Sequence, residues 1–238
     1  MSCCTKAQDA IAGRRLAVFA QPICDLDGGA TVFEELLLRV RTSSAGIVGP
    51  GELLASAERE GTISQIDEWV LQKAAELTGR GRAVSVNVSA ASVSDPAFLE
   101  AAERILHTGE TDPALITFEV TETALASDLI QACRFAERLV GLGCSFALDD
   151  FGTGYGSLTY LKHLPIRYLK IDMSFIRDLV HDRRSQALVG GIVALARGFE
   201  HHTVAEGIED AATLTVAADL GVDLGQGFLI GHPREIVA

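Results

Sequence analysis

Apolar positions along the chain follow two alternating patterns. Short runs rich in Val, Leu, Ile and Phe predict strands, and the longer stretches between them carry apolar residues at helical spacing. The predicted strands are residues 16–23, 31–39, 83–88, 115–120, 144–149, 167–172, 203–206 and 225–229. Strand and helix repeated to a count of eight predict an α/β fold of the TIM (βα)8 barrel type. We expect residues 1–14 to form an N-terminal tail and residues 15–238 to form one domain.

The first two predicted strands break this alternation. Only CDLDGGA (24–30) separates them, whereas a parallel crossover needs about a dozen residues or more. An Asp-Gly-Gly turn is typical of a hairpin, so we expect a modified barrel with one antiparallel strand in an N-terminal hairpin. Residues 41–82 are long enough for two helices, which the pattern places at 51–60 and, behind the candidate cap Ser64, at 65–77.

Polar and glycine residues mark other helix boundaries. Asp95, which precedes a proline, Ser127 and Asp210 are predicted helix starts. Glycines at 109, 141 and 221 follow predicted helix ends.

Composition narrows the class of protein. The 238 residues carry a formal charge of −12, with 48% apolar and 22% charged residues, which argues against a disordered chain and against a protein that coats DNA. No apolar run approaches the roughly 20 residues that cross a bilayer, and the first residues are too polar for a signal peptide. We therefore expect a soluble cytoplasmic protein that binds neither DNA nor a membrane. The five cysteines lack metal-ligand spacing, which predicts free thiols.

Polar residues cluster near the C-terminal ends of the predicted strands. The carboxylates there are Glu35, Glu119, Asp149, Asp150 and Glu206, and they are accompanied by Asn87 and Lys170. In a barrel these ends surround one mouth, so the carboxylates would lie close together and would need protons or cations to neutralise them. Oxygen ligands favour Mg²⁺, Mn²⁺ or Ca²⁺ over Zn²⁺, and a pair of such ions suits in-line attack on phosphorus.

Each of these residues also has a plainer interpretation. A lone Asp or Glu at a strand end is more often a helix cap or part of a surface ion pair, and residues 149–155 (DDFGTGY) could form only a turn. The coincidence of such groups on successive predicted strands favours a metal site. The six histidines are scattered, so none is assigned to a metal.

Eight motifs give the chain a family resemblance. They are QPI (21–23), ELLLR (35–39), SVNVS (85–89), FEVTE (118–122), LDDFGTGYGSL (148–158), LPIRYLKIDMSF (164–175), VAEGIE (204–209) and QGFLIGHP (226–233). In this order they resemble the EAL-domain cyclic di-GMP phosphodiesterases from about residue 15 to the end. The resemblance implies a barrel with one antiparallel strand, in agreement with the hairpin predicted above.

The resemblance also implies two metal ions in each active site. Glu35, Asn87, Glu119 and Asp149 are expected to hold the first metal, and Asp149, Asp150 and Glu206 the second. Mg²⁺ or Mn²⁺ is expected to support the reaction, and Ca²⁺ is expected to bind and inhibit.

Catalytic and supporting roles follow from the same resemblance. Lys170 is expected to orient the attacking water, with Asp172 in support, and Glu206 to serve both catalysis and the second metal. Glu122 is expected to hold the 150–158 loop and to couple it to the interface of a homodimer.

Cyclic di-GMP is the small-molecule partner that the resemblance implies. The residues expected to contact it are Gln21, Arg39 and Gln226. Glu209 is expected to contact the metal ligands rather than the metals.

The chain departs from the family pattern at several positions. Leu36 stands where Ala is usual in the Glu-Ala-Leu signature, Phe33 where Gly is common and Gly156 where Ser is usual, and residues 40–44 replace an aromatic residue and a His-Pro segment. Every expected metal ligand and Lys170 is retained. We therefore expect a metal-dependent phosphodiesterase that hydrolyses cyclic di-GMP to linear 5′-pGpG.

Two alternatives stay open. One is a catalytically weak or inactive EAL-like domain that acts as a cyclic di-GMP receptor or protein-interaction module, although such domains usually lose metal ligands. The other is a Mg²⁺ barrel enzyme that abstracts a proton, which would need a second lysine at the mouth beside Lys170.

Overall fold

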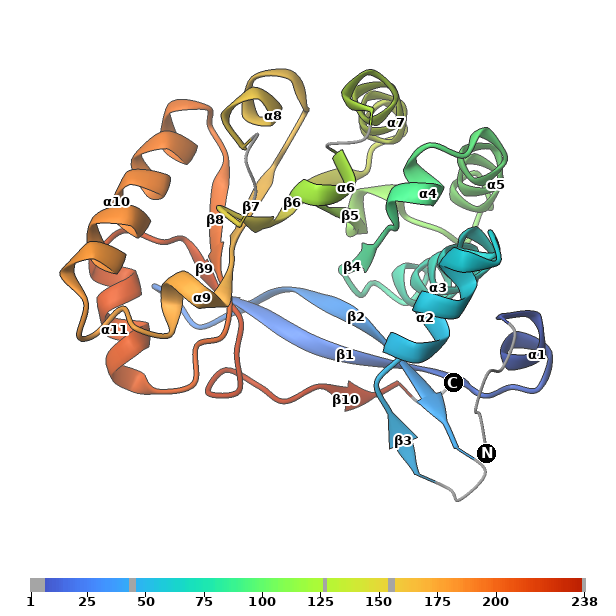
Figure 1. The fold of residues 1–238 in the computed structure, drawn as a ribbon, viewed down its shortest axis with the longest axis horizontal. Helices are drawn as coiled ribbons and strands as arrows, with labels where there is room; N and C mark the ends of the chain where they lie inside the picture. The colour runs from blue at the N-terminus through green and yellow to red at the C-terminus, as the bar shows by residue number, and fades with distance from the viewer. Residues whose placement is uncertain (1–6, 43–45, 126–127, 154–156, 237–238) are drawn as a thin grey trace.

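The computed structural model describes residues 7–42, 46–125, 128–153 and 157–236 (Figure 1). Among these residues, eight strands close into a barrel in the order β1-β2-β4-β5-β6-β7-β8-β9, and β9 pairs back with β1. β1 runs antiparallel to β2 and to β9, and the other neighbouring strands of the described barrel are parallel. The predicted α/β barrel with one antiparallel strand in an N-terminal hairpin is confirmed. The barrel strands are β1 (Leu16–Asp25), β2 (Thr31–Arg41), β4 (Val84–Asn87), β5 (Ile116–Thr121), β6 (Ser145–Phe151), β7 (Tyr168–Ile171), β8 (His202–Ala205) and β9 (Leu224–Gly225).

The turn between β1 and β2 makes the antiparallel pair possible. Asp25 Oδ1 accepts hydrogen bonds from the backbone N–H groups of Asp27 (2.7 Å) and Gly28 (3.0 Å). Gly29 adopts a φ of +68°, a conformation that favours glycine. The hairpin is therefore closed by the Asp25 carboxylate together with the predicted Asp-Gly-Gly segment at 27–29.

The last barrel strand is shorter than the predicted 225–229 segment. β9 ends at Gly225, and the chain then turns because Gly227 lies against the backbone of Ile208, where a Cβ would be 2.0 Å from the carbonyl oxygen. A further strand, β10 (Arg234–Glu235), pairs with the part of β1 that β9 leaves open.

Helices surround the barrel (Figure 1). They are α1 (Ala7–Ala12), α2 (Gly51–Arg59), α3 (Ile63–Thr78), α4 (Ala90–Val93), α5 (Pro96–Leu106), the 3-10 helix η1 (Pro113–Leu115), α6 (Glu122–Leu125), α7 (Leu129–Gly141), α8 (Ser157–His163), α9 (Met173–Ile176), α10 (Arg183–Gly198) and α11 (Ala211–Asp219). A two-residue strand, β3 (Ile47–Val48), extends β2 on the outside.

Several helix boundaries agree with the capping residues. Asp95 and Asp210 each accept a 2.9 Å hydrogen bond from a backbone N–H in the first turn of α5 and α11. The predicted start at Ser127 lies outside the described residues. Both helices predicted between 41 and 82 are present, but Ser64 is not a cap: α3 already begins at Ile63, whose buried side chain belongs to the apolar face of the helix.

The barrel interior changes from apolar to polar toward the mouth. One layer of buried apolar side chains fills it, contributed by Ile23, Phe33, Ala147, Tyr168, Val204 and Leu224. Each of these residues has a polar residue two positions away in the sequence. In the same order, these polar residues are Gln21, Glu35, Asp149, Lys170, Glu206 and Gln226. Because side chains alternate between the two faces of a strand, the polar set forms the next layer of the interior.

Residues 7–12, within the segment expected to be a tail, form α1. Its Ala7 and Ala10 are buried in a cluster shared with α2 and α3. None of the helices in the described ranges is both long enough and apolar enough to span a bilayer. The described cysteines, Cys24, Cys133 and Cys144, are free thiols as predicted, and Cys3 and Cys4 lie outside the described residues.

Candidate active site

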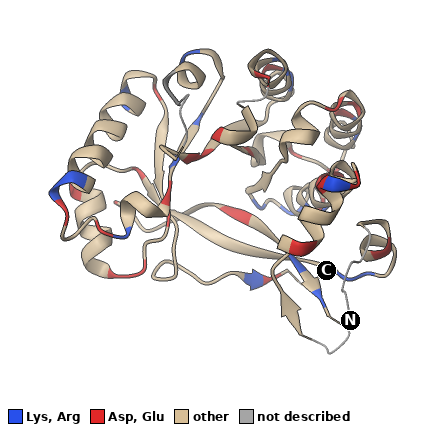
Figure 2. Ribbon diagram, viewed as in Figure 1, with Lys and Arg blue, Asp and Glu red and all other residues tan. Residues whose placement is uncertain are grey.

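Acidic residues converge on the mouth of the barrel. Figure 2 shows Asp and Glu on β2 and where β6 ends, among strands that are otherwise largely uncharged. Glu35 and Glu119 are buried on β2 and β5, and Asp149 is buried on β6. The predicted convergence of the strand-end carboxylates is thus present in the structure.

Lys170 lies at the centre of this cluster. Its Nζ is 2.7 Å from Glu119 Oε2, 2.7 Å from Glu206 Oε1, 3.0 Å from Asp149 Oδ1 and 3.6 Å from Glu35 Oε2. The lysine side chain is 1% exposed, so water screens these charges poorly. One ammonium cannot balance four carboxylates, and the remaining negative charge requires protons or further cations.

Two of the carboxylates take up protons in the metal-free protein. Burial raises the pKa of Glu119 to about 8, and the charges of Glu35 and Asp149 add to this effect against the opposing charge of Lys170. Burial also raises the pKa of Glu206 to about 8, with the charge of Asp149 contributing and Lys170 opposing. At neutral pH both groups are therefore largely protonated in the absence of metal.

Glu35 and Lys170 remain charged. Burial disfavours the Glu35 carboxylate, yet the charge of Lys170 and hydrogen bonds from Gln226 and Asn87 hold its pKa below the usual value. Burial alone would lower the pKa of Lys170, but Glu119 and the other carboxylates raise it well above its usual range.

Amide side chains hold Glu35 from both sides. Asn87 Nδ2 donates to Glu35 Oε1 (2.7 Å), and Gln226 Nε2 donates to Glu35 Oε2 (2.6 Å). Gln21 Nε2 donates to the carbonyl of Gly231 (3.0 Å), and its Oε1 lies 3.3 Å from Gln226 Nε2. These contacts bring the predicted nucleotide-contacting residues Gln21 and Gln226 against the predicted metal ligand Glu35.

Asp149, Asp150 and Glu206 form a compact acidic trio. One carboxylate oxygen from each lies within 4.8 Å of the others. Asp150 has a φ of +54°, an uncommon conformation for a non-glycine residue, and its N–H donates to Asp149 Oδ1 at 3.0 Å. Burial and the charges of Asp149 and Asp172 raise the pKa of Asp150.

The donor atoms fit a hard divalent cation. All are carboxylate or amide oxygens, which suit Mg²⁺, Mn²⁺ or Ca²⁺, and no described His or Cys belongs to the trio. Within the described part of the chain, Glu119 Oε1 is buried without a hydrogen-bond partner, as expected of an oxygen placed for a ligand. Glu35, Asn87, Glu119 and Asp149 could hold one metal, and Asp149, Asp150 and Glu206 a second.

Glu122 and Asp172 lie behind these ligands. Glu122 is 2% exposed, and its Oε2 is 3.4 Å from the N–H of Gly152 in the turn after Asp150. Asp172 Oδ1 accepts a hydrogen bond from the Ser174 N–H (3.0 Å) and so caps α9. The part of the predicted loop at 154–156 lies outside the described residues.

Arg39 and Glu209 lie nearer the surface. The Arg39 guanidinium is 5.8 Å from the centre of the Phe19 ring and donates to the Leu38 carbonyl at 2.8 Å. Arg39 and Asn87 line a cavity of about 310 Å³ between β2, α2 and α3. Glu209 follows β8 with an exposed side chain.

Asp67 lines the same cavity and was not predicted from the sequence. Its Oδ2 accepts hydrogen bonds from the Ser89 N–H (3.0 Å), Ser89 Oγ (2.7 Å) and Ser92 Oγ (2.7 Å), and burial raises its pKa. The available signal was its place on the apolar face of α3, where a carboxylate needs buried partners.

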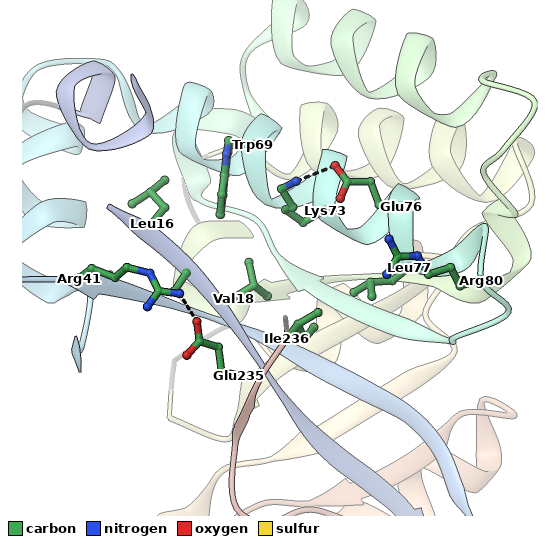
Figure 3. Close-up of a pocket in the computed structure, with 11 residues that line it drawn as sticks. Leu16, Val18, Arg41, Trp69, Lys73, Glu76, Leu77, Arg80, Glu235 and Ile236 are labelled. Carbon is green, nitrogen blue, oxygen red and sulfur yellow. Dashed lines mark hydrogen bonds and ion pairs between the residues drawn. The ribbon is translucent and has the colours of Figure 1, made fainter. Parts of the chain in front are cut away.

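A second cavity, of about 230 Å³, lies between β1, α3 and β10 (Figure 3). Trp69 lines it, with the Lys73–Glu76 ion pair (2.6 Å) on α3 and the Arg41–Glu235 pair facing it from the strands. Among its described lining residues there is no predicted site residue.

Known proteins share this sequence pattern. The family model described as the EAL domain matches residues 5–233. The chain is 37% identical over 234 residues to the bifunctional diguanylate cyclase/cyclic di-GMP phosphodiesterase MucR of Pseudomonas aeruginosa, covering 95% of this chain and 34% of that protein. It is 33% identical over 238 residues to cyclic di-GMP phosphodiesterase PdeF of Escherichia coli, covering 98% of this chain and 32% of that protein. The chain thus spans about a third of the length of these relatives.

Solved structures share the fold over nearly the whole chain. The PaMucR phosphodiesterase in complex with c-di-GMP superposes with a TM-score of 0.89 at 35% identity, covering 95% of each chain. The FimX EAL domain from Pseudomonas aeruginosa bound to c-di-GMP gives a TM-score of 0.90 at 28% identity, covering 95% of this chain and 94% of that chain. The resemblance carried by the eight motifs is confirmed, and this chain belongs to the EAL domain family.

Proposed function

We propose that this chain is a phosphodiesterase that hydrolyses cyclic di-GMP to linear 5′-pGpG with two divalent cations, Mg²⁺ or Mn²⁺. The observation that carries the proposal is the buried set of carboxylates around Lys170, in which Glu119 Oε1 is left without a hydrogen-bond partner among the described residues. Two relatives named as cyclic di-GMP phosphodiesterases support the substrate class.

When bound, two such cations lower the pKa of a water and neutralise charge on the scissile phosphate. Lys170 would hold the attacking water and stabilise the charge that develops as the water oxygen bonds to phosphorus and the P–O3′ bond breaks, while one proton of the water passes to the departing 3′-oxygen. Gln21, Arg39 and Gln226 would bind and orient the dinucleotide. Burial of Glu35 and Glu119 excludes bulk water and strengthens these electrostatic effects.

Product analysis tests the proposal directly. Cyclic di-GMP is incubated with the purified chain and Mg²⁺ or Mn²⁺, with and without excess EDTA, and products are identified by mass spectrometry. We expect 5′-pGpG, loss of turnover with EDTA or Asp149→Ala, and unchanged turnover in Glu100→Ala, whose carboxylate is exposed on the outer helix α5. Tight binding of cyclic di-GMP without product would favour the receptor alternative instead.

Calcium provides a second test of the metal requirement. Ca²⁺ tolerates looser geometry and polarises water less than Mg²⁺, so it should bind the same oxygens and support little hydrolysis. Hydrolysis in excess EDTA at the rate measured with Mg²⁺ would contradict a two-metal reaction.

We further propose a homodimer in which Glu122 links the turn after β6 to the subunit interface. The buried Glu122 carboxylate and its contact with Gly152 support the link within one subunit. Light scattering at assay concentration measures the assembly, and a fully active monomer would remove the dimer from this account.

A further inference from the structure

The short helix α9 lies between the two turns that carry the acidic trio. It follows β7 directly, and Figure 1 shows it beside β8. Because β7 pairs with β6 on one side and β8 on the other, α9 stands between the end that bears Asp150 and the end that bears Glu206. Asp172 anchors the helix: its Oδ1 accepts from the Ser174 N–H, and its carbonyl accepts from the Phe175 N–H, both at 3.0 Å.

On the β6 side, the ring of Phe175 packs directly on Gly152. A Cβ on Gly152 would lie 3.0 Å from Phe175 Cζ and only 2.7 Å from Cε2, and the second distance is shorter than real Cβ contacts. Gly152 also has a φ of +103°, and it lies two residues after Asp150. Only glycine allows both this backbone conformation and this close contact.

On the β8 side, Met173 packs on Gly207 in the same way. A Cβ on Gly207 would lie 2.8 Å from Met173 Cβ, and Gly207 has a φ of +74°. Gly207 directly follows Glu206. The helix thus contacts both turns that carry the trio, at two glycines whose lack of a side chain allows close packing.

We infer that α9 is a spacer, in which the Phe175 ring and Met173 Cβ are positioning groups that set the distance between Asp150 and Glu206. Asp150 holds a φ of +54°, a conformation that persists only where its surroundings enforce it. A small divalent cation demands ligand oxygens at nearly fixed distances, so a loosened spacer should weaken metal binding. This inference rests on the proposed function only in requiring that the trio bind a divalent cation.

Metal titration of Phe175 variants tests the spacer. Mn²⁺ binding is measured by calorimetry without substrate for the wild type, Phe175→Ala and Phe175→Leu. We expect about tenfold or greater weakening for Phe175→Ala, the range seen when groups behind metal ligands are removed, and a smaller effect for Phe175→Leu, which fills part of the space. Phe199→Ala is the matched control. It makes the same truncation at the C-cap of α10, where the Phe199 side chain is 41% exposed, and it should bind Mn²⁺ like the wild type.

Kinetics separate positioning from general damage. In Phe175→Ala the Mn²⁺ concentration for half-maximal turnover should rise with the calorimetric constant, and kcat should recover at saturating Mn²⁺. A variant that binds Mn²⁺ as the wild type does, whatever its turnover, would overturn the spacer.

A glycine variant keeps the inference testable if Phe175→Ala does not fold. Gly152→Ala places a methyl group against the ring and should weaken Mn²⁺ binding, and Gly152→Ala/Phe175→Leu should recover part of the loss by relieving that contact. Equal Mn²⁺ affinity in wild type and Gly152→Ala would contradict the spacer and leave the proposed function standing. If the wild-type chain binds no Mn²⁺, the proposed function is contradicted, and so is the spacer, which depends on metal binding.

Discussion

Lys170 sets the charge balance of the mouth. Its ammonium lies 2.7 to 3.6 Å from four carboxylates, and in the metal-free protein it supplies the positive charge that those groups need. Bound divalent cations would compete for the same oxygens, so metal binding should release Lys170 from at least part of this network. The lysine would then be free to act on water and on developing negative charge.

Replacing Lys170 should therefore separate chemistry from binding. Lys170→Ala is expected to lower kcat by about 100-fold or more while the KM for cyclic di-GMP changes little, because the lost interaction forms in the transition state. Steady-state kinetics at saturating Mn²⁺ measure both constants. A variant that keeps its kcat and loses affinity would make Lys170 a substrate clamp instead.

Metal binding should also release protons. The pKa values of Glu119 and Glu206 are about 8 without metal, so both carry protons at pH 7 that a bound cation must displace. Calorimetry at pH 7 in buffers of different ionisation enthalpy should show proton release, and the release should shrink by pH 9. Glu119→Gln should release fewer protons than the wild type, and equal release from both would contradict this assignment.

The sequence predicts which residues reach the mouth but not how they bond there. Strand alternation places Glu35, Asp149 and Lys170 on the inner face, because each lies two positions from a buried apolar neighbour. The bond from Gln226 to Glu35 joins residues 191 positions apart and depends on closure of the barrel. Asp67 escaped prediction because its partners Ser89 and Ser92 come from another element.

At the scale of elements, local signals predicted most of the fold. Asp25 and the Asp-Gly-Gly segment that follows it form the turn of the antiparallel β1–β2 pair, and Asp95 caps α5. The boundaries that failed depend on tertiary contacts: Ser64 lies inside α3 because Ile63 packs in the core, and the predicted strand at 225–229 stops early because Gly227 meets Ile208. Ile63 continues the helical spacing of Ile66 and Val70, whereas the contact of Gly227 with Ile208 leaves no periodic trace in the sequence.

The turn after β6 offers a test of one element acting on another. Glu122, at the start of α6, accepts a hydrogen bond from Gly152, so Glu122→Ala should loosen the turn that carries Asp150. We expect a folded protein whose turnover is lowered about tenfold or more and which needs a higher Mn²⁺ concentration for activity, although Glu122 is not itself a ligand. Glu137→Ala, at an exposed carboxylate on α7, serves as the control. Wild-type kinetics in Glu122→Ala would show that Glu122 has only a structural role.

At the scale of the whole molecule, the site lowers the stability of the fold that builds it. Glu119 and Glu206 have an ordinary pKa of 4.5 in the unfolded chain and about 8 in the folded, metal-free protein. Between these two pH values the folded state binds more protons than the unfolded state. The free energy of unfolding therefore falls as pH rises through that window.

Divalent cations should reverse this dependence, because they replace protons as the neutralising charge and bind only the folded site. Thermal melts at pH 5.5, 7 and 8.5 should show a stabilisation by Mn²⁺ that grows with pH. Burial lowers the pKa of His201, so its contribution to stability rises with pH and opposes the carboxylates at the acidic end. The double variant Glu119→Gln/Glu206→Gln keeps that histidine and should lose the decline of the metal-free protein between pH 7 and 8.5. If the wild type and this variant melt in parallel at every pH without metal, the buried carboxylates are not what links stability to the metal site.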